Sequence, residues 1–309
     1  MKSVVITGGD GFLGRHVCNY LVSSGYEVYA IVLPESTFLA NGLERLHIVK
    51  GNISECEGVL RDLPSEPEAF LHLAWGGVTP DLRHDYAFQL QNVDLALEAV
   101  KLARRIQTKK FIFPGSTMEY AYNEGIINEK SLPAPMNAYG VAKISARYAC
   151  ESLCRDLEIP YVYCVISGIY SEDRKDNNVI YYTIDKLLNN EMPMLTALEQ
   201  KWDYVHIDDV VYALELVIAN ENKNRFYAIG HGDNCRLSEY IFQIKDIICP
   251  KAELGIGMIP YDNGRMPDSR VDLTPLVEDT GYVPRVEFKD GIARVINRIK
   301  NERELSIGK

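Results

Sequence analysis

The sequence lacks a long apolar segment, since no apolar run approaches the roughly 18 residues that a membrane-spanning helix needs. The apolar run Val4-Val5-Ile6 comes almost at once, which leaves no room for the basic leader and hydrophobic core of a signal peptide. There is also no basic excess, because 33 Lys and Arg stand against 43 Asp and Glu, a formal net charge of −10. These absences argue against membranes and nucleic acids as the main partners, although a helix N-terminus can still bind a phosphate locally.

Cysteine is scarce and its spacing is not that of a metal site. The seven cysteines are odd in number and lack the close pairs of a zinc site. Cys150 and Cys154 are one helical turn apart in an apolar stripe, which predicts buried free thiols. We therefore expect a reduced cytoplasmic enzyme without a metal.

Short apolar runs alternate with helix-period segments over the first two-thirds of the chain. The runs predict strands at residues 4–7, 28–33, 48–50, 69–74, 110–114 and 161–167, and the periodic segments predict helices at 13–23, 86–105 and 138–157. Such alternation implies parallel strands joined by right-handed crossovers. The expected fold class is α/β, a doubly wound Rossmann-type sheet that binds ligands at the carboxyl ends of its strands.

After about residue 170 the pattern becomes irregular. Helices are predicted near residues 178–190, 209–219, 237–248 and 288–300, separated by turns such as Tyr261-Asp262-Asn263-Gly264. No repeat or linker is visible. We therefore expect a Rossmann domain at residues 1–170 and a smaller α/β substrate-binding lobe at 171–309 that exchanges some elements with the first domain and closes over the end of the sheet.

A glycine-rich loop follows the first predicted strand, with the sequence Thr7-Gly8-Gly9-Asp10-Gly11-Phe12-Leu13-Gly14. Glycines at positions 8, 11 and 14 suit a tight turn, close approach of the backbone to a pyrophosphate, and close packing of helix on strand. The helix that follows would present free N–H groups and the positive end of its dipole to the phosphates. The context after a strand and before an amphipathic helix favours a dinucleotide site over an ordinary turn.

The end of the second predicted strand should distinguish NAD from NADP. A carboxylate there suits the free 2′-hydroxyl of NAD, and an arginine suits the phosphate of NADP. Neither stands at the strand end, although Glu35 lies slightly beyond it. Arg15, Ser36 and Thr37 could bind a 2′-phosphate, so the prediction is NADP, with NAD as the alternative.

Tyr139 and Lys143 stand four residues apart, which places them on one face of a predicted helix. An unperturbed tyrosine has a pKa of about 10, and a fixed cation nearby favours the phenolate and makes proton exchange possible near neutral pH. The alternative is an ordinary pair on a solvated helix. The catalytic interpretation is favoured because Gly115-Ser116-Thr117 ends the preceding strand, where a hydroxyl can reach a substrate oxygen.

Together these motifs resemble the NAD-dependent epimerase/dehydratase family of extended short-chain dehydrogenases, and most closely its nucleotide-deoxysugar 4-ketoreductases. The segments that carry the resemblance span nearly the whole chain: residues 7–14, Leu71-His72-Leu73-Ala74, Asn92, Ser116-Thr117, Tyr139-x-x-x-Lys143, residues 202–210, and residues 280–284 followed by Phe288 and Gly291-Ile292.

The resemblance implies roles for individual residues. Tyr139 would be the general acid/base, Lys143 would orient the nicotinamide ribose and tune Tyr139, and Thr117 or Ser116 would bind the reacting oxygen. The implied cofactor-binding residues are Gly8, Gly11, Phe12, Leu13, Gly14, Asn52, Ile53, Leu73, Ala74, Trp75, Asn92, Tyr139 and Lys143. The implied substrate-binding residues are Glu119, Trp75, Asn178, Arg265 and Arg270, of which one arginine would meet the diphosphate.

Family members share hydride transfer at a sugar carbon and differ in the steps that follow. A 4,6-dehydratase needs an acid where this chain has Met118, so dehydration is not expected, and the diphosphate-binding arginine common before Asp203 is here Trp202. The preferred prediction is a 4-ketoreductase in deoxysugar and surface-polysaccharide precursor biosynthesis. The alternatives are a C4 epimerase, a decarboxylase using Glu119, and, in a different class, a non-catalytic dinucleotide sensor.

Three further expectations concern the surface of the molecule. Arg83-His84-Asp85 follows the fourth predicted strand and could touch substrate, but is better explained as a solvated loop. Asp208 is predicted to cap the N-terminus of the next helix rather than to bind a metal. The helices at 86–105 and 138–157, with Ala149, Leu153 and Leu157, are predicted to pair across a two-fold axis in a homodimer.

Overall fold

Seven parallel strands form the central sheet of this computed structural model, which describes residues 2–38, 42–79, 81–122, 125–174, 178–233, 235–261 and 268–307. The strand order is β12-β7-β5-β4-β1-β2-β3, and every neighbouring pair is parallel. The strands are β1 (Ser3–Thr7), β2 (Glu27–Val32), β3 (Leu46–Lys50), β4 (Ala69–His72), β5 (Phe111–Ser116), β7 (Tyr161–Ile166) and β12 (Phe226–Ile229). The predicted Rossmann-type sheet is confirmed.

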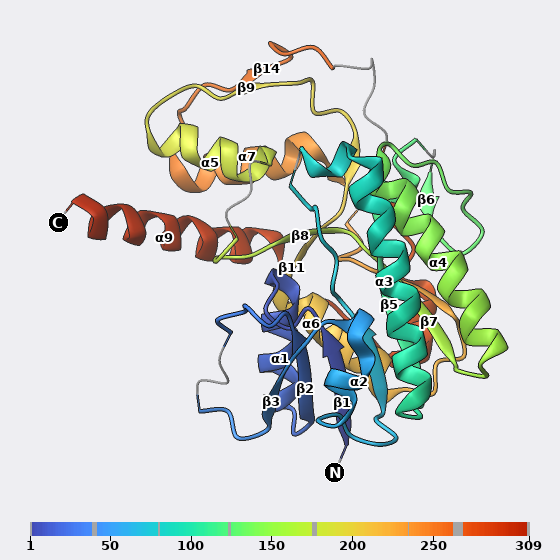
Figure 1. Cartoon of the computed structure of the whole chain (residues 1–309). Coiled ribbons are helices and arrows are strands. Elements are labelled where there is room, and N and C mark those ends of the chain that lie inside the picture. The colour runs from blue at the N-terminus through green and yellow to red at the C-terminus, as the bar shows by residue number, and fades with distance from the viewer. Residues whose placement is uncertain are drawn as a thin grey trace.

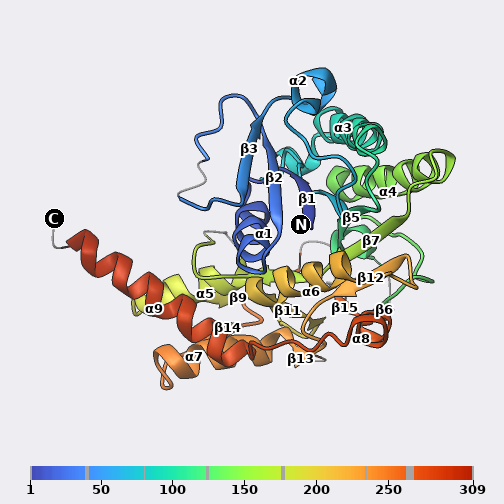
Figure 2. The same cartoon turned by 90° about the horizontal axis from the view of Figure 1, so that it is seen from below.

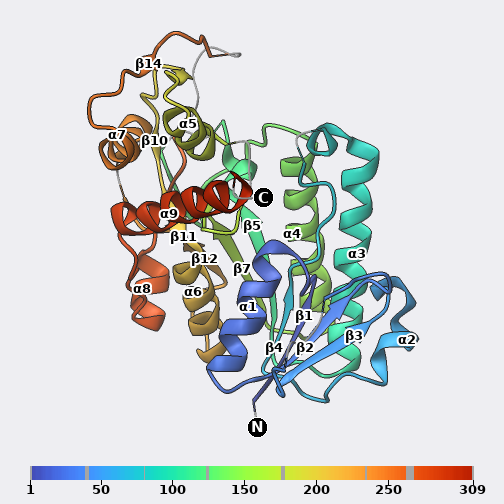
Figure 3. The same cartoon turned by 90° about the vertical axis from the view of Figure 1, so that its left-hand side faces the viewer.

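Alternate residues of each strand enter two separate hydrophobic cores. On β1, Val4 and Ile6 pack with α1 (Phe12–Ser23) and α6 (Ile207–Ala219), whereas Val5 packs on the opposite face. That opposite face is covered by α3 (Tyr86–Arg105) and α4 (Ala138–Asp156). Figures 2 and 3 show the two helix pairs on either side of the sheet. Because both faces are covered, the interior positions of the strands are mostly apolar, as is usual for parallel strands.

A third hydrophobic core lies beyond the carboxyl ends of the strands. It is built by α5 (Val179–Leu188), α7 (Leu237–Ile248) and α9 (Phe288–Ile307). Figure 1 shows α5 and α7 at the end of the molecule opposite the N-terminus. The order of the strands reverses between β1 and β4, and parallel sheets bind ligands at such a point.

The remaining elements are short. They are η1 (Ile53–Glu55), α2 (Cys56–Leu60), η2 (Leu82–His84), η3 (Thr117–Tyr120), β6 (Ile126–Ile127), β8 (Gly168–Tyr170), β9 (Met194–Leu195), β10 (Lys201–Trp202), β11 (Tyr204–His206), β13 (Cys235–Arg236), β14 (Gly255–Ile256), β15 (Arg270–Val271) and α8 (Thr274–Thr280). Cys150 and Cys154 are buried and free, as predicted. Within the described ranges, no helix is both long and apolar enough to cross a membrane.

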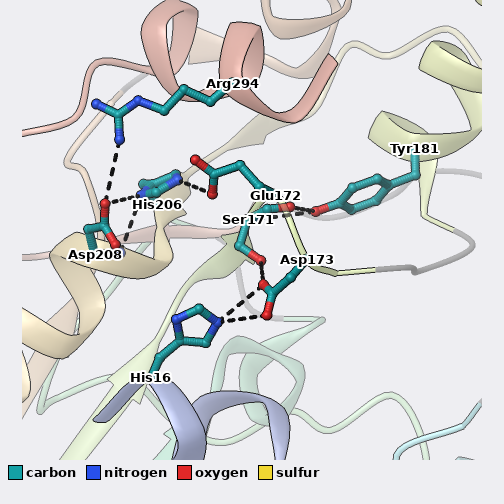
Figure 4. Close-up of polar contacts among 8 residues, drawn as sticks. All are labelled: His16, Ser171, Glu172, Asp173, Tyr181, His206, Asp208 and Arg294. Atoms are coloured by element: carbon teal, nitrogen blue, oxygen red, sulfur yellow. Dashed lines mark hydrogen bonds and ion pairs between the residues drawn. The ribbon is translucent and has the colours of Figure 1, made fainter. Parts of the chain in front are cut away.

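A buried histidine links the start of α6 to two neighbouring segments (Figure 4). The Nε2 atom of His206 lies 3.1 Å from the Glu172 carboxylate, and its Nδ1 atom lies 3.3 Å from that of Asp208. Asp208 also pairs with Arg294 of α9 at 3.5 Å. Burial opposes the charge on His206, but hydrogen bonds to Asp208 and Glu172 outweigh it and raise its pKa to about 9. His206 occupies the N-cap position of α6, so the prediction of Asp208 as the cap was wrong.

A second set of contacts ties the same loop to α1. His16 of α1 lies 3.1 Å from the Asp173 carboxylate, which also accepts a hydrogen bond of 2.7 Å from the Ser171 hydroxyl. The Tyr181 hydroxyl of α5 donates to the Ser171 carbonyl at 2.8 Å. The segment after β8 is therefore fixed to both the sheet domain and the distal helices (Figure 4).

Candidate active site

The loop between β1 and α1 forms a backbone cradle that only glycine permits. Gly8 has φ of 68°, and a Cβ atom there would lie 2.8 Å from the backbone of Ala74. A Cβ atom at Gly14 would lie 2.1 Å from the Gly8 carbonyl oxygen. Helix α1 therefore packs directly on the turn, and these glycines carry no side chain that would block a ligand bound along the loop backbone.

The first turn of α1 is free to bind an anion. Gly11 is its N-cap residue and provides no side chain to the amide groups that follow. Phe12 and Leu13 begin the helix, and the Arg174 guanidinium lies 4.9 Å from the centroid of the Phe12 ring. Free amides, the helix dipole and a nearby cation suit a pyrophosphate, so these residues fit the dinucleotide that the loop predicts.

The residues predicted at the adenosine end follow β2 and β3. Val32 is buried at the end of β2, whereas Glu35 and Arg15 are exposed to solvent. Ser36 Oγ accepts a hydrogen bond from the Phe38 amide at 3.2 Å. After β3, the Asn52 carboxamide accepts from the Ser54 amide at 3.1 Å, and the neighbouring Ile53 is buried. No carboxylate closes the end of β2, as expected from the sequence.

Tyr139 lies in the first turn of α4, which begins where the Asn137 side chain caps the Gly140 amide at 3.0 Å. A Cβ atom at Gly140 would lie 2.7 Å from the Met118 carbonyl, so this glycine allows η3 to approach the helix. The Ser116 side chain acts on the Tyr139 hydroxyl to lower its pKa. Part of the Tyr139 residue remains accessible, yet the protein around the hydroxyl raises its pKa to about 12, chiefly through burial.

Lys143 lies on the same face of α4 and is buried. Its Nζ atom donates to the Pro114 carbonyl at 3.1 Å and lies 3.9 Å from the centroid of the Trp75 ring. The distance from Nζ to the centroid of the Tyr139 ring is 6.0 Å. Burial lowers the pKa of Lys143, and the charge of Glu119 partly opposes that effect. The structure therefore groups the predicted catalytic pair with Trp75.

Ser116 is the hydroxyl residue that acts to lower the pKa of Tyr139. Ser116 also ends β5 and caps η3, accepting from the Met118 amide at 3.2 Å. Glu119 is fully buried: one carboxylate oxygen accepts from the Ser116 amide at 2.7 Å, and the other accepts from the Tyr163 hydroxyl. Burial raises the pKa of Glu119. A contact between Glu119 and substrate would require the carboxyl group to leave both partners.

The loop between β4 and α3 is held by two buried amide side chains. Asn92 pairs with both backbone groups of Gly76, accepting at 2.8 Å and donating at 3.2 Å. Gln89 accepts from the Trp75 indole at 3.0 Å and donates to the Gly77 carbonyl at 2.7 Å. Asn92 therefore acts on the loop that carries Trp75. Gln89 was not predicted, although it stands three residues before Asn92 and so shares its helix face.

The contacts of the substrate-binding residues predicted after residue 170 do not connect these residues to one another. Asn178 caps α5, accepting from the Ile180 amide at 3.0 Å. Arg270 pairs with Asp268 at 3.3 Å. The Trp202 indole nitrogen is buried against Gly168 and has no hydrogen-bond partner within the described ranges. Arg265 falls outside the described residues.

Arg83 is placed differently from the solvated loop that we expected. It is partly buried on η2, and its guanidinium carbon lies 5.9 Å from the centroid of the Tyr139 ring. Its neighbour His84 is exposed, in agreement with the prediction. Sequence alone gave no reason to separate these two side chains, because the turn that orients them is set by tertiary contacts.

Comparison with known proteins agrees with this geometry. The family model described as NAD dependent epimerase/dehydratase family matches residues 4–230. The chain is 26% identical over 313 residues to a putative UDP-glucose 4-epimerase of Methanocaldococcus jannaschii, covering 96% of this chain and 98% of that protein. It is 28% identical over 234 residues to dTDP-6-deoxy-L-talose 4-dehydrogenase (NAD(+)) of Aggregatibacter actinomycetemcomitans, covering 72% and 83%. The solved UDP-glucose 4-epimerase of Thermotoga maritima superposes with a TM-score of 0.79 at 25% identity, covering 97% and 99%.

Proposed function

The chain belongs to the NAD dependent epimerase/dehydratase family, and from its site we propose that it is an oxidoreductase acting at C4 of a nucleotide-diphosphate sugar, with 4-ketoreduction as its reaction. One observation carries this proposal. Tyr139 lies with Lys143 and Trp75 where the glycine cradle of β1 and α1 would deliver a dinucleotide. This is the set of groups that hydride transfer at a carbinol or ketone carbon needs.

A nicotinamide dinucleotide fits the cradle, and when bound it would supply or accept the hydride at C4. Gly8, Gly11 and Gly14 would admit its pyrophosphate to the amides of α1. Trp75 and Lys143 would border its nicotinamide end, since they lie beside Tyr139. The residues beyond β2 leave both NADP and NAD open, with NADP proposed from Arg15, Ser36 and Thr37.

The protein groups support proton transfer in the direction of reduction. The raised pKa keeps Tyr139 a neutral phenol at physiological pH, so its O–H can donate a proton to a C4 carbonyl oxygen as that carbon is reduced. Ser116, which acts on the same phenol to lower its pKa, would help orient that oxygen, and Thr117 is the next hydroxyl along the chain. An epimerase must begin by oxidation, in which Tyr139 would accept the proton instead.

Dehydration is not proposed. Met118 offers no acid at the position where a dehydratase would need one. Glu119, the neighbouring carboxyl group, is buried and holds the Ser116 amide and the Tyr163 hydroxyl. The same contacts weaken the alternative of decarboxylation through Glu119.

A C4 epimerase is the second candidate. It is supported by the relatives named as UDP-glucose 4-epimerases, which this chain matches over nearly its whole length. The two reactions differ in cofactor turnover: a ketoreductase consumes one NAD(P)H for each product, whereas an epimerase regenerates its cofactor and shows no net change in nicotinamide absorbance.

The test is a panel of nucleotide-4-keto sugars incubated with NADPH or NADH, with the fall in nicotinamide absorbance recorded. The same panel of unoxidised nucleotide hexoses, with products read by proton NMR, detects epimerisation. A stoichiometric, substrate-dependent fall supports the reductase, and an epimer without net absorbance change supports the second candidate. Tight dinucleotide binding with neither reaction would replace both with a non-catalytic sensor.

A further inference from the structure

We propose that Arg83 is a positioning residue for proton transfer, a permanent positive charge packed on the ring of Tyr139 that stabilises the anion left when the phenol gives up its proton. The inference rests on the proposed function in one respect, that Tyr139 is the proton carrier. It adds a cation from outside the Tyr139 and Lys143 helix.

The geometry of Arg83 is that of a cation–π contact. Its guanidinium carbon lies 5.9 Å from the centroid of the Tyr139 ring, within the range at which a ring attracts a cation. The Nε atom of Arg83 is buried and has no hydrogen-bond partner within the ranges that the structure describes. The contact with the Tyr139 ring is therefore the interaction of the Arg83 guanidinium on which the proposal rests.

The turn that carries Arg83 is fixed from inside the protein. Gln89 is fully buried, and its side-chain amide donates to the carbonyl of Leu82, the residue before Arg83, at 3.1 Å and to that of Gly77 at 2.7 Å. Its carbonyl oxygen accepts from the Trp75 indole at 3.0 Å. A single side chain thus sets both the turn of Arg83 and the ring on which Lys143 lies.

Lys143 is the second cation over the ring of Tyr139, at nearly the same distance as Arg83. Its ammonium group is directed to the Pro114 carbonyl and the Trp75 ring, and it lies 6.0 Å from the centroid of the Tyr139 ring. Burial lowers the pKa of Lys143, which weakens its hold on the positive charge. A guanidinium keeps its proton over the physiological pH range, so Arg83 supplies a positive charge there whatever the protonation state of Lys143.

The other groups that act on Tyr139 come from three further elements. Burial is the largest influence and raises the pKa of Tyr139, and the charge of Glu119 on η3 raises it further. Arg83 on η2, the Ser116 hydroxyl at the end of β5 and Arg174 after β8 all act to lower it. Of the two arginines, Arg83 is the one that lies over the Tyr139 ring, where Lys143 also lies.

The experiment titrates Tyr139 without a substrate. Phenolate absorbance is recorded immediately after a pH jump, before alkaline unfolding, and the curve of Tyr139→Phe is subtracted to isolate this tyrosine. The same difference is taken in an Arg83→Gln and an Arg83→Met background. Removing the charge should raise the midpoint of Tyr139 by about one pH unit in both backgrounds. The matched control is Arg104→Gln, an exposed arginine at the other end of α3, which should leave the midpoint unchanged.

An unchanged midpoint in Arg83→Gln and Arg83→Met, or an equal rise in Arg104→Gln, would overturn the proposal. Because no substrate is used, this result is independent of the reaction proposed above. Once a substrate is known, the Arg83→Gln variant should lose kcat by about tenfold at neutral pH with little change in KM, and Arg83→Lys should recover much of it. A raised KM with an unchanged midpoint would show instead that Arg83 binds an anionic group of the substrate.

Discussion

Single residues around Tyr139 set the balance between its neutral phenol and its phenolate. Burial and Glu119 favour the neutral phenol, whereas Ser116 and the two arginines favour the anion. The net effect of these groups is a raised pKa of Tyr139, so its phenol stays protonated at neutral pH. A substitution of Glu119, Ser116 or either arginine should therefore change the pH dependence of the reaction before it changes the fold.

Tyr139→Phe is predicted to lower turnover by orders of magnitude, because the variant keeps the ring and its contacts but has no proton to give. Cofactor binding should stay near the wild-type value, since the cradle of α1 is untouched. Turnover and a fluorescence titration with NAD(P)H measure the two quantities. A variant that keeps activity within a few-fold of wild type would remove Tyr139 from the mechanism.

Lys143→Met is predicted to damage both turnover and cofactor affinity, and so differs from Tyr139→Phe. The lysine lies on Trp75 and beside Tyr139, and the proposed mechanism gives it contacts to the nicotinamide ribose as well. The same two measurements compare the variants. If only turnover fell and the affinity for dinucleotide were intact, the proposed ribose contact would be wrong.

The sequence predicted that Tyr139 and Lys143 lie close together because they are four residues apart, a local relation that helix geometry converts into proximity. It could not decide between Ser116 and Thr117, because that choice depends on how η3 packs against Gly140. It assigned Arg83 to a solvated loop, because the place of Arg83 is set by Gln89 through contacts across a loop. The proximity of two residues on one helix can be predicted from their spacing, whereas contacts between elements depend on packing that a sequence motif does not describe.

Among the secondary-structure elements, the end of β2 has the clearest consequence for specificity. Val32 closes the strand without a carboxylate, and Arg15 and Glu35 are both exposed nearby. An arginine favours a 2′-phosphate and a carboxylate repels it. The preference for one cofactor is therefore decided by which of two exposed side chains reaches the ribose.

We predict tighter binding of NADPH than of NADH, because Arg15, Ser36 and Thr37 offer three phosphate donors against the single charge of Glu35. Paired titrations at one fixed ionic strength measure the two affinities. Arg15→Gln should weaken NADPH binding by about tenfold and leave NADH nearly unchanged. Tighter binding of NADH, or NADH retained through purification, would contradict the prediction and direct attention to Glu35.

The start of α6 gives a prediction about stability. His206 has a pKa raised to about 9, so its charged form is favoured in the folded state over the unfolded state, where an ordinary histidine titrates near 6.5. The resulting stabilisation is complete below about pH 6.5 and is lost as the pH rises through about 9. Because Glu172 and Asp208 are partly exposed, we expect the loss to be about 1–2 kcal/mol.

Denaturant unfolding at a series of pH values tests this expectation. The free energy of unfolding should decline between about pH 6.5 and 9 in the wild type, and His206→Gln should flatten that decline. His84→Gln is the control, since His84 is exposed on η2 and lies outside the cluster around His206. An equal decline in wild type and His206→Gln would assign the pH dependence to other groups, of which His231 beside Asp233 is the first to examine.

The elements themselves were predicted unevenly. The first six strands and the three long helices of the sheet domain were predicted within a few residues, because each is a long apolar or amphipathic run. Strand β12 was missed: Phe226–Ile229 is four residues long, and nothing near it marks a return to the sheet. Its pairing with β7 is a long-range contact, and the register that fixes it appears only in three dimensions.

Across the whole molecule, the surface of α3 and α4 is the face we expect to pair in a homodimer. Tyr86 and Leu90 of α3 are 59% and 50% exposed, and Tyr148 of α4 is 49% exposed. Leu153 and Leu157 are partly buried against the core below. Large apolar side chains gathered on neighbouring helices are typical of a surface that another protein covers.

The prediction is a two-fold dimer through α3 and α4, and light scattering at micromolar concentration measures the mass. Leu90→Glu should shift the chain toward the monomer, since it places a charge in the centre of the predicted interface. Val283→Glu is a control, because Val283 is 63% exposed and lies outside both helices. A monomeric wild type would rule out this assembly.

The late position of β12 in the chain has a consequence for how the protein is made. During synthesis β7 leaves the ribosome well before β12. One edge of β7 therefore stays unpaired while the intervening helices are still being synthesised. An unpaired strand edge is a site at which another nascent chain can attach. Chaperone demand should therefore peak in that interval, and ribosome-bound chains arrested before residue 226 should capture more chaperone than chains arrested after the strand has emerged.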